Sequence, residues 1–185
     1  MSTTTFTGKL VRLVAADLDN DPKLFASWDQ DSEYQRLFNS EAALRYNPAQ
    51  IKKFLEEEIG SMHLFVIERL EDGRKIGQVD LSGFNWIVGN AWVGIGIGER
   101  DLWGKGYGTD AMRVLLRYAF DELNLKRLTL NVFDINQRGI ASYEKAGFRR
   151  EGVLPGGLLI AGKRRDIIYM GILRREWEAL QQNDH

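Results

Sequence analysis

The stretch Asp101-Leu102-Trp103-Gly104-Lys105-Gly106-Tyr107-Gly108-Thr109-Asp110 places three glycines between two apolar segments. Before it, the pattern from Trp92 to Gly98 predicts a strand. After it, apolar residues recur at the spacing of one helical face: Met112, Leu115, Leu116, Ala119, Phe120 and Leu123. Glycine allows positive φ and close approach, and the first turn of a helix has N–H groups without intrahelical partners, so this junction suits a phosphate or pyrophosphate.

Two familiar phosphate-binding motifs do not fit this junction. A Walker loop reads Gly-x-x-x-x-Gly-Lys-Ser/Thr, but Glu99 stands at the first glycine and Gly106 stands at the hydroxyl position. The dinucleotide fingerprint reads Gly-x-Gly-x-x-Gly, whereas the glycines in residues 94–98 and 104–108 both run Gly-x-Gly-x-Gly. The alternative left open by the residues alone is a simple strand-to-helix bend.

Length and composition favour one soluble domain. The 185 residues are predicted to form a single domain over 1–185, with its core at about 8–178. With 25 Lys+Arg against 26 Asp+Glu, the net charge of −1 gives no general attraction to nucleic acid. The polar start and the lack of a long apolar run predict no membrane association and a cytoplasmic location.

The counts of reactive side chains exclude several chemistries. The chain has no cysteine, so thiol nucleophiles, disulfides and thiolate metal sites are excluded. Its two histidines, His63 and His185, suggest neither a Ser-His-Asp triad nor a metal cluster. Any acyl transfer is therefore expected to be direct or to use a nucleophile other than a thiol, and no metal is expected.

The N-terminal part is predicted to contain a strand at residues 9–14 followed by helices. Asp21-Pro22 and Asn47-Pro48 each offer an N-cap residue followed by proline, and the second of these helices should end before Gly60. Residues 32–38 are expected to form a short helix between them. The apolar residues expected to face inward are Leu10, Leu13, Leu24, Phe25, Trp28, Ile51, Phe54, Leu55 and Ile59.

The middle and C-terminal parts are predicted to be mainly strands. Residues 62–68, 75–84 and 92–98 should form an antiparallel meander. Residues 127–133 should form the next strand, and a closing hairpin should follow from Gly152 to Leu173.

A second stretch has a more specific pattern. Residues 136–148 read Asn-Gln-Arg-Gly-Ile-Ala-Ser-Tyr-Glu-Lys-Ala-Gly-Phe, in which Asn136 caps a helix that stops at Gly147. The two stretches together resemble, in order and spacing, the acyl-CoA loop and the second signature of the GNAT superfamily of N-acetyltransferases. The superfamily loop reads Arg/Gln-x-x-Gly-x-Gly/Ala, and Trp103 stands at the Arg/Gln position. This departure is similar to the branch that contains the ribosomal-protein-alanine and spermidine acetyltransferases.

The resemblance covers nearly all of the chain after Gly8 and implies a fold. That fold is α+β, with a mostly antiparallel central sheet of six to seven strands flanked by helices and splayed between strands 4 and 5. The implied activity is transfer of acetyl from acetyl-CoA to a primary amine by direct attack in a ternary complex. The implied cofactor-binding residues are Ile95, Gly96, Ile97, Trp103, Gly104, Lys105, Gly106, Tyr107, Gly108, Thr109, Asn136 and Tyr143.

Two residues are expected to do the proton chemistry. The resemblance makes Tyr143 the general acid, since a phenol with a pKa of about 10 is protonated at neutral pH and can donate to the departing thiolate. An alkyl ammonium must lose a proton before attack, and Glu99, which follows the fourth strand, is the candidate base. Asp134, which follows the fifth strand, is an alternative.

The acceptor stays open at this point between a protein N-terminus, a polyamine and a small amine. The resemblance implies that the early helical region, with the loop through Leu44, forms one wall of its site, where Asp29, Asp31 and Glu33 would attract an amine. A different class of function, a catalytically weak acyl-CoA sensor or scaffold, remains because no base is obvious. Trp86 and Trp92 would suit a homodimer interface, although core packing is the commoner use of such residues.

Overall fold

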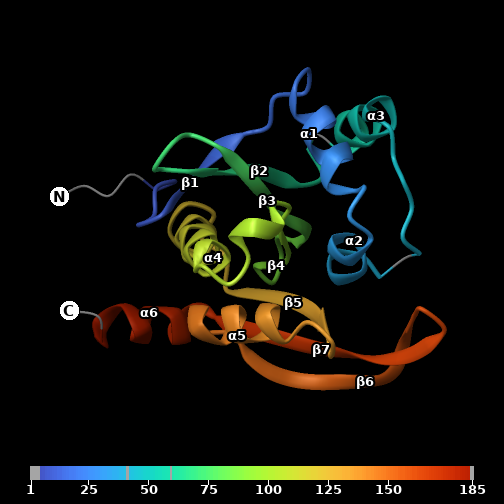
Figure 1. The fold of residues 1–185 in the computed structure, drawn as a ribbon. Helices are drawn as coiled ribbons and strands as arrows, with labels where there is room; N and C mark the ends of the chain where they lie inside the picture. The colour runs from blue at the N-terminus through green and yellow to red at the C-terminus, as the bar shows by residue number, and fades with distance from the viewer. Residues whose placement is uncertain (1–4, 41, 59, 184–185) are drawn as a thin grey trace.

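A computed structural model describes residues 5–40, 42–58 and 60–183. Its sheet has the strand order β1-β2-β3-β4-β5-β7-β6, and helices flank it (Figure 1). The strands are β1 (Val11–Ala15), β2 (His63–Arg69), β3 (Lys75–Asn85), β4 (Asn90–Ile97), β5 (Arg127–Phe133), β6 (Arg149–Ile160) and β7 (Lys163–Leu173). The helices are α1 (Asp21–Trp28), α2 (Ser32–Phe38), α3 (Pro48–Glu58), α4 (Tyr107–Arg117), α5 (Gln137–Ala146) and α6 (Arg174–Asn183). The predicted α+β architecture is confirmed.

The sheet is antiparallel except where β4 meets β5. These two strands run parallel and pair only at Asn90 with Arg127, Ala91 with Leu128, and Trp92 with Thr129. Beyond those pairs the two strands diverge, and Figure 1 shows β1 to β4 and the β5-β7-β6 group as two separate parts of the sheet. The predicted splay between the fourth and fifth strands is confirmed, and among the described residues it leaves one edge of residues 93–97 without a neighbouring strand.

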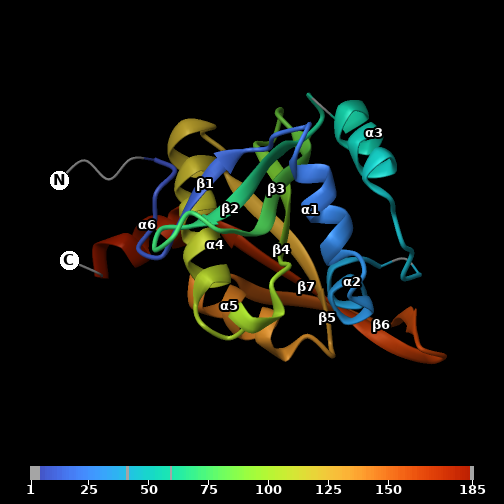
Figure 2. The same ribbon diagram turned by 45° about the horizontal axis from the view of Figure 1, so that its top comes forward.

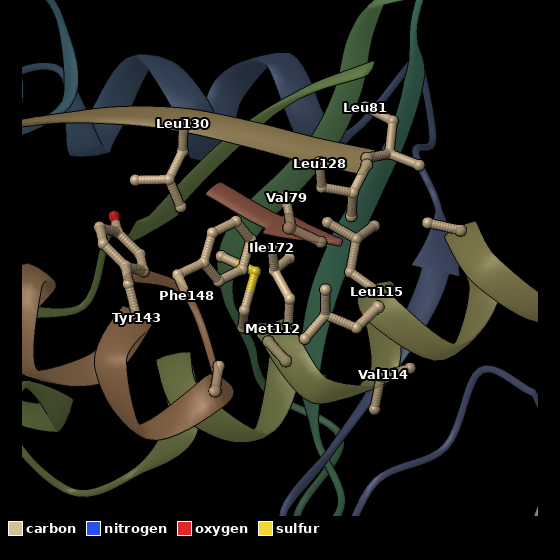
Figure 3. Packing of buried hydrophobic residues seen from close by; sticks show 14 of the residues in the cluster. Val79, Leu81, Met112, Val114, Leu115, Leu128, Leu130, Tyr143, Phe148 and Ile172 are labelled. Carbon is tan, nitrogen blue, oxygen red and sulfur yellow. The ribbon is translucent and has the colours of Figure 1, made fainter. Parts of the chain in front are cut away.

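The main core lies between the sheet and α4. The predicted apolar stripe of this helix is confirmed, since Met112, Leu115, Ala119 and Phe120 are all fully buried. Figure 3 shows Met112 and Leu115 packed against Val79, Leu128 and Ile172 from the sheet, among others. The stripe continues from α4 into a π-helical segment, η2 (Tyr118–Glu122), because Ala119 and Phe120 still face the sheet there.

The glycines of β4 make room for the helices on the opposite face. A Cβ placed on Gly98 would lie 2.1 Å from Cδ2 of Trp28, and one on Gly96 would lie 2.7 Å from the hydroxyl oxygen of Tyr34. Trp28 ends α1 and Tyr34 belongs to α2, so α2 contacts the main chain of β4 and α1 contacts the residue that directly follows this strand. Gly96 and Gly98 therefore serve packing, which the sequence did not reveal.

Replacing Gly98 with alanine should destabilise the protein by about 2 kcal/mol, because the new methyl group cannot coexist with the indole of Trp28. Urea unfolding would measure the change. Gly152→Ala is the matched control, since a Cβ there meets no atom within 4 Å among the described residues. Equal unfolding free energies for the two variants would contradict this account of the strand.

Some inward-facing predictions are wrong. Leu10 is 41% exposed because β1 begins only at Val11. Phe54 is 53% exposed because α3 buries a narrow stripe in which Leu55 alone is fully covered. Ile59, like His185, lies outside the described residues. The C-terminal helix α6 was not predicted.

Two classes of feature are absent from the described part of the chain. None of its helices combines the length and the apolar character needed to cross a bilayer. Its Asp, Glu and His side chains form no group of three or more that could hold a metal ion.

Candidate active site

A pocket of about 280 Å³ lies beside the splay. Its lining residues come from β4, from residues 103–109, which we call the glycine loop, from α5 and from α2. Figure 2 shows where these elements lie in the fold. The predicted cofactor-binding residues that line it are Ile95, Gly96, Ile97, Trp103, Gly104, Gly106, Tyr107, Gly108, Thr109, Asn136 and Tyr143. Lys105 lies in the loop but does not line the pocket. The structure thus brings two distant stretches of sequence to one site.

The glycine loop turns the start of α4 toward the pocket. Gly104 and Gly106 have φ values of 75° and 89°, which residues other than glycine rarely adopt. Gly106 is also the N-cap of α4. The N–H groups of residues 107–109, in the first turn of the helix, have no acceptor within the helix. These amides and the positive end of the helix dipole favour an anion at the pocket.

Helix α5 supplies the second wall. Asn136 caps it, as predicted, by accepting a hydrogen bond of 2.9 Å from the N–H of Gly139. Tyr143 follows further along this helix and is 9% exposed. Its ring meets that of Phe148 edge to face at 6.4 Å, and Figure 3 shows its hydroxyl at the margin of the packed group.

Burial fixes the protonation state of this phenol. Removal from water disfavours the phenolate and raises the pKa of Tyr143 to about 12. The hydroxyl is therefore protonated at neutral pH and available as a proton or hydrogen-bond donor in the pocket.

Arg138 and Ser142 line the pocket and were missed by the sequence reasoning, and each contacts a residue that was predicted. Trp103 donates its indole N–H to the carbonyl of Ile97 at 2.6 Å, and the guanidinium of Arg138 lies 4.2 Å from its ring centroid. The hydroxyls of Thr109 and Ser142 are 2.9 Å apart and join the start of α4 to α5. Arg138 and Ser142 lie within the second signature, residues 136–148, so their place in this motif was the signal that could have identified them. The remaining lining residues without an earlier prediction are Tyr34, Leu37, Phe38, Leu102, Gly139, Ala141 and Lys145.

The two carboxylates considered as bases lie outside this pocket lining. Glu99 accepts the indole N–H of Trp28 at 2.8 Å and forms an ion pair with Arg74. Asp134 has one oxygen 3.9 Å from Arg165. The structure therefore does not bring either carboxylate together with Tyr143.

The acidic wall expected from the early helices is largely neutralised. Arg100, in the 3-10 turn η1 (Arg100–Leu102), pairs with Asp31 at 2.6 Å and with Glu33 at 2.5 Å. Its hydrogen bonds hold the pKa of Asp31 below the usual value. Asp29 differs, because burial raises its pKa. Of the three predicted carboxylates, Asp29 is the one that Arg100 does not bind.

Comparisons with known proteins agree with this geometry. The family model described as acetyltransferase (GNAT) domain matches residues 11–149. A putative ribosomal N-acetyltransferase, YdaF, of Bacillus subtilis (strain 168) is 36% identical over 109 residues, which are 59% of this chain and 59% of that protein. Spermidine N(1)-acetyltransferase of Escherichia coli (strain K12) is 36% identical over 115 residues, covering 62% of this chain and 60% of the relative. The matches thus span about three fifths of these relatives' length.

Solved structures extend the similarity over most of the chain. A spermidine N-acetyltransferase from Vibrio cholerae, solved with CoA and spermine, superposes with a TM-score of 0.82 at 25% identity, covering 91% of this chain and 98% of that one. An acetyltransferase (GNAT family) from Bacillus anthracis has a TM-score of 0.78 at 18% identity and covers 92% and 98% of the two chains, which shows a shared fold. The family match, the splayed sheet and the glycine loop together establish that this chain belongs to the GNAT acetyltransferase family.

Proposed function

We propose that this protein transfers an acetyl group from acetyl-CoA to a primary amine. The observation that carries the proposal is the meeting, in one pocket, of the glycine-loop amides, the unpaired edge of β4 and the hydroxyl of Tyr143. Membership of the family and the relatives named as N-acetyltransferases support it. The coverage of those relatives is partial, so the activity rests on the chemistry of this site.

The lining fits the donor acetyl-CoA. Glycine-loop amides at residues 104–109 would hold the pyrophosphate, and the guanidinium of Arg138 stands beside them over Trp103. The main chain of residues 95–97 would bond the amide-bearing arm along the edge that β5 leaves free. Asn136 lines the same part of the pocket, and Lys105 adds charge from the loop surface. Bound acetyl-CoA supplies the activated acyl group.

Proton movement is assigned to the protein's own side chains. Tyr143 is proposed as the donor to the departing thiolate, in keeping with its protonated state. Glu99, the base proposed from its sequence position, is held by Arg74 and Trp28, which disfavours direct contact with an amine in the pocket.

Mass spectrometry after incubation with acetyl-CoA would test this function. The acceptor panel should contain polyamines, amino acids, aminoglycosides and N-terminal peptides, and thiol release should be followed in parallel. A gain of one acetyl group on one class would support the activity and identify the acceptor. Tight acetyl-CoA binding without any acetylated product would contradict it and favour a sensor or scaffold.

The identity of the amine acceptor, the cellular location and the oligomeric state are further parts of the proposal. The spermidine acetyltransferase relatives favour a polyamine and the ribosomal relative favours a protein N-terminus, and we retain both together with small amines. The polar, weakly charged chain is proposed to be cytoplasmic, acting without nucleic acid or membrane. A homodimer through Trp86 and Trp92 is a further proposal, supported by their exposures of 60% and 41%.

A further inference from the structure

A carboxylate on β3 lies over the main chain of β4 where the splay begins. Asp80 is the cross-strand partner of Gly94, and a Cβ placed on that glycine would lie 2.3 Å from the Asp80 Oδ1 atom. The last pair between β4 and β5 is at Trp92, two residues earlier. The carboxylate therefore occupies the space that Gly94 leaves open, just inside the divergence of the two strands.

The pocket lies next to this point, beginning further along β4 at residues 95–97. Side chains alternate along a strand, so Gly94 and Gly96 share a face of β4, as Asp80 and Gln78 share one of β3. Gly96 lines the pocket, and so does Tyr34, whose hydroxyl is 3.5 Å from the Nε2 atom of Gln78. Tyr143 enters from α5. The phenol on α5 lines the pocket, whereas Asp80 is not itself a lining residue and lies opposite Gly94, two residues along β4 from the lining residue Gly96.

The surroundings leave this carboxylate without a cation. The described residues provide no ion pair to Asp80, whereas Glu99 is bound by Arg74, and Asp31 and Glu33 by Arg100. Its cross-strand neighbours, Leu64 on β2 and Gly94 on β4, do not titrate.

Burial sets the proton affinity of Asp80. Burial raises the pKa of Asp80 to about 6, and the hydrogen bond from Ser82 acts in the opposite direction and lowers this pKa. On this face, the phenol of Tyr34 from α2 lies beside Gly96 and burial keeps it protonated, and the carboxylate of Asp29, which follows α1, acts on that phenol. A carboxylate of this kind is largely ionised at neutral pH and binds a proton more tightly than a solvated one.

We propose that Asp80 is the general base that takes the proton from the acceptor ammonium, directly or through one water. This inference rests on the proposed acetyl transfer. Asp80 accepts one proton, and the freed lone pair of nitrogen attacks the thioester carbon. The C–S bond breaks as Tyr143 gives its proton to sulfur, and the second N–H proton restores the phenol. Asp80 then releases its proton to water, so amide, CoA thiol and one proton are formed.

The isosteric variant Asp80→Asn tests the proposal with an amine that the wild-type protein acetylates. At pH 7 its kcat/KM should fall by about 100-fold or more. Its rate should then rise about tenfold per pH unit toward the amine pKa, because only free amine reacts. The wild-type rate should fall only below about pH 6. The Kd for acetyl-CoA, measured by calorimetry, should stay within about twofold.

A second variant keeps the carboxylate and changes its proton affinity. Ser82→Ala removes the hydrogen bond that lowers the pKa of Asp80, so the acidic limb of kcat/KM should move to higher pH. A purely structural role of Asp80 would not move this limb. This measurement also decides the proposal if Asp80→Asn does not fold.

Two further proteins complete the test. Asp121→Asn, a change of the same kind at an exposed position, should retain the wild-type profile. An unchanged profile in both Asp80→Asn and Ser82→Ala, or loss of the acidic limb in Glu99→Gln instead, would overturn the assignment. Absence of any acetylated product from the wild-type protein would overturn the proposed function itself, and the role of Asp80 with it.

Discussion

Replacing Tyr143 with phenylalanine should lower kcat by about 100-fold or more, while the affinity for acetyl-CoA changes little. The reason is that the departing thiolate loses its proton donor, whereas the apolar ring that packs against Phe148 remains. Steady-state kinetics and calorimetry on the same preparation would measure both quantities. Normal turnover across a panel of accepted amines would contradict the role of Tyr143.

The raised pKa of Tyr143 adds a second expectation to this experiment. With a pKa of about 12, the phenol stays protonated up to about pH 10, so its ionisation should not lower the wild-type rate below that pH. A thiol has a pKa of about 8.5, so complete transfer from this phenol is uphill by roughly 5 kcal/mol. Donation must therefore accompany the return of a proton from the amine nitrogen. Tyr118→Phe is the matched control, because it removes a hydroxyl that is hydrogen-bonded to His63 outside the pocket.

Replacing Asp110 with alanine should lower the free energy of unfolding by about 3 kcal/mol, because three main-chain donors lose a charged acceptor. The carboxylate is 8% exposed and accepts hydrogen bonds from the N–H groups of Lys9, Leu10 and Val11, at 3.1, 2.7 and 3.1 Å. It therefore fastens the start of β1 to the first turn of α4. Urea unfolding would give the change.

The same anchor also reaches the glycine loop. A Cβ on Gly106 would lie 3.5 Å from Cδ1 of Leu10, so the segment held by Asp110 covers the loop from outside. Asp110→Asn should cost less than the alanine change, since it keeps one acceptor oxygen but turns an amide group toward donors. Asp121→Ala, an exposed aspartate further along the same helical run, should change stability little. Equal losses in the Asp110 and Asp121 alanine variants would contradict the anchoring role.

Local signals account for the elements that were predicted well. The bounds of α2 and β5 agree with residues 32–38 and 127–133, because a cap at Asp31 and an alternating apolar pattern each act within a few residues. The helix between Asn136 and Gly147 is equally local, with a side-chain cap at one end and a left-handed glycine at the other. The meander was predicted from its strand and turn patterns, the splay and the fold class were predicted through the family resemblance, and all three are confirmed.

Long-range pairing accounts for what the sequence could not show. Arg100 reaches Asp31 over 69 positions and Glu33 over 67, so an acidic wall became an ion-pair cluster. The same kind of contact holds Glu99 to Arg74 and Trp28. No periodicity marks such pairs. The assignment of one domain to residues 1–185, and of each binding and catalytic role, stays a prediction.

The short join between β4 and β5 has a mechanical meaning. The sheet consists of two groups of strands, β1 to β4 and β5-β7-β6. Within the sheet, only three residue pairs between β4 and β5 join these groups among the described residues. Helices α4 and α5 pack together as the second attachment. A ligand in the pocket would contact β4 on one side and α5, the helix that follows β5, on the other. The protein thus gains a pocket beside the place where two strands of its sheet separate, without removing side chains from its packed core.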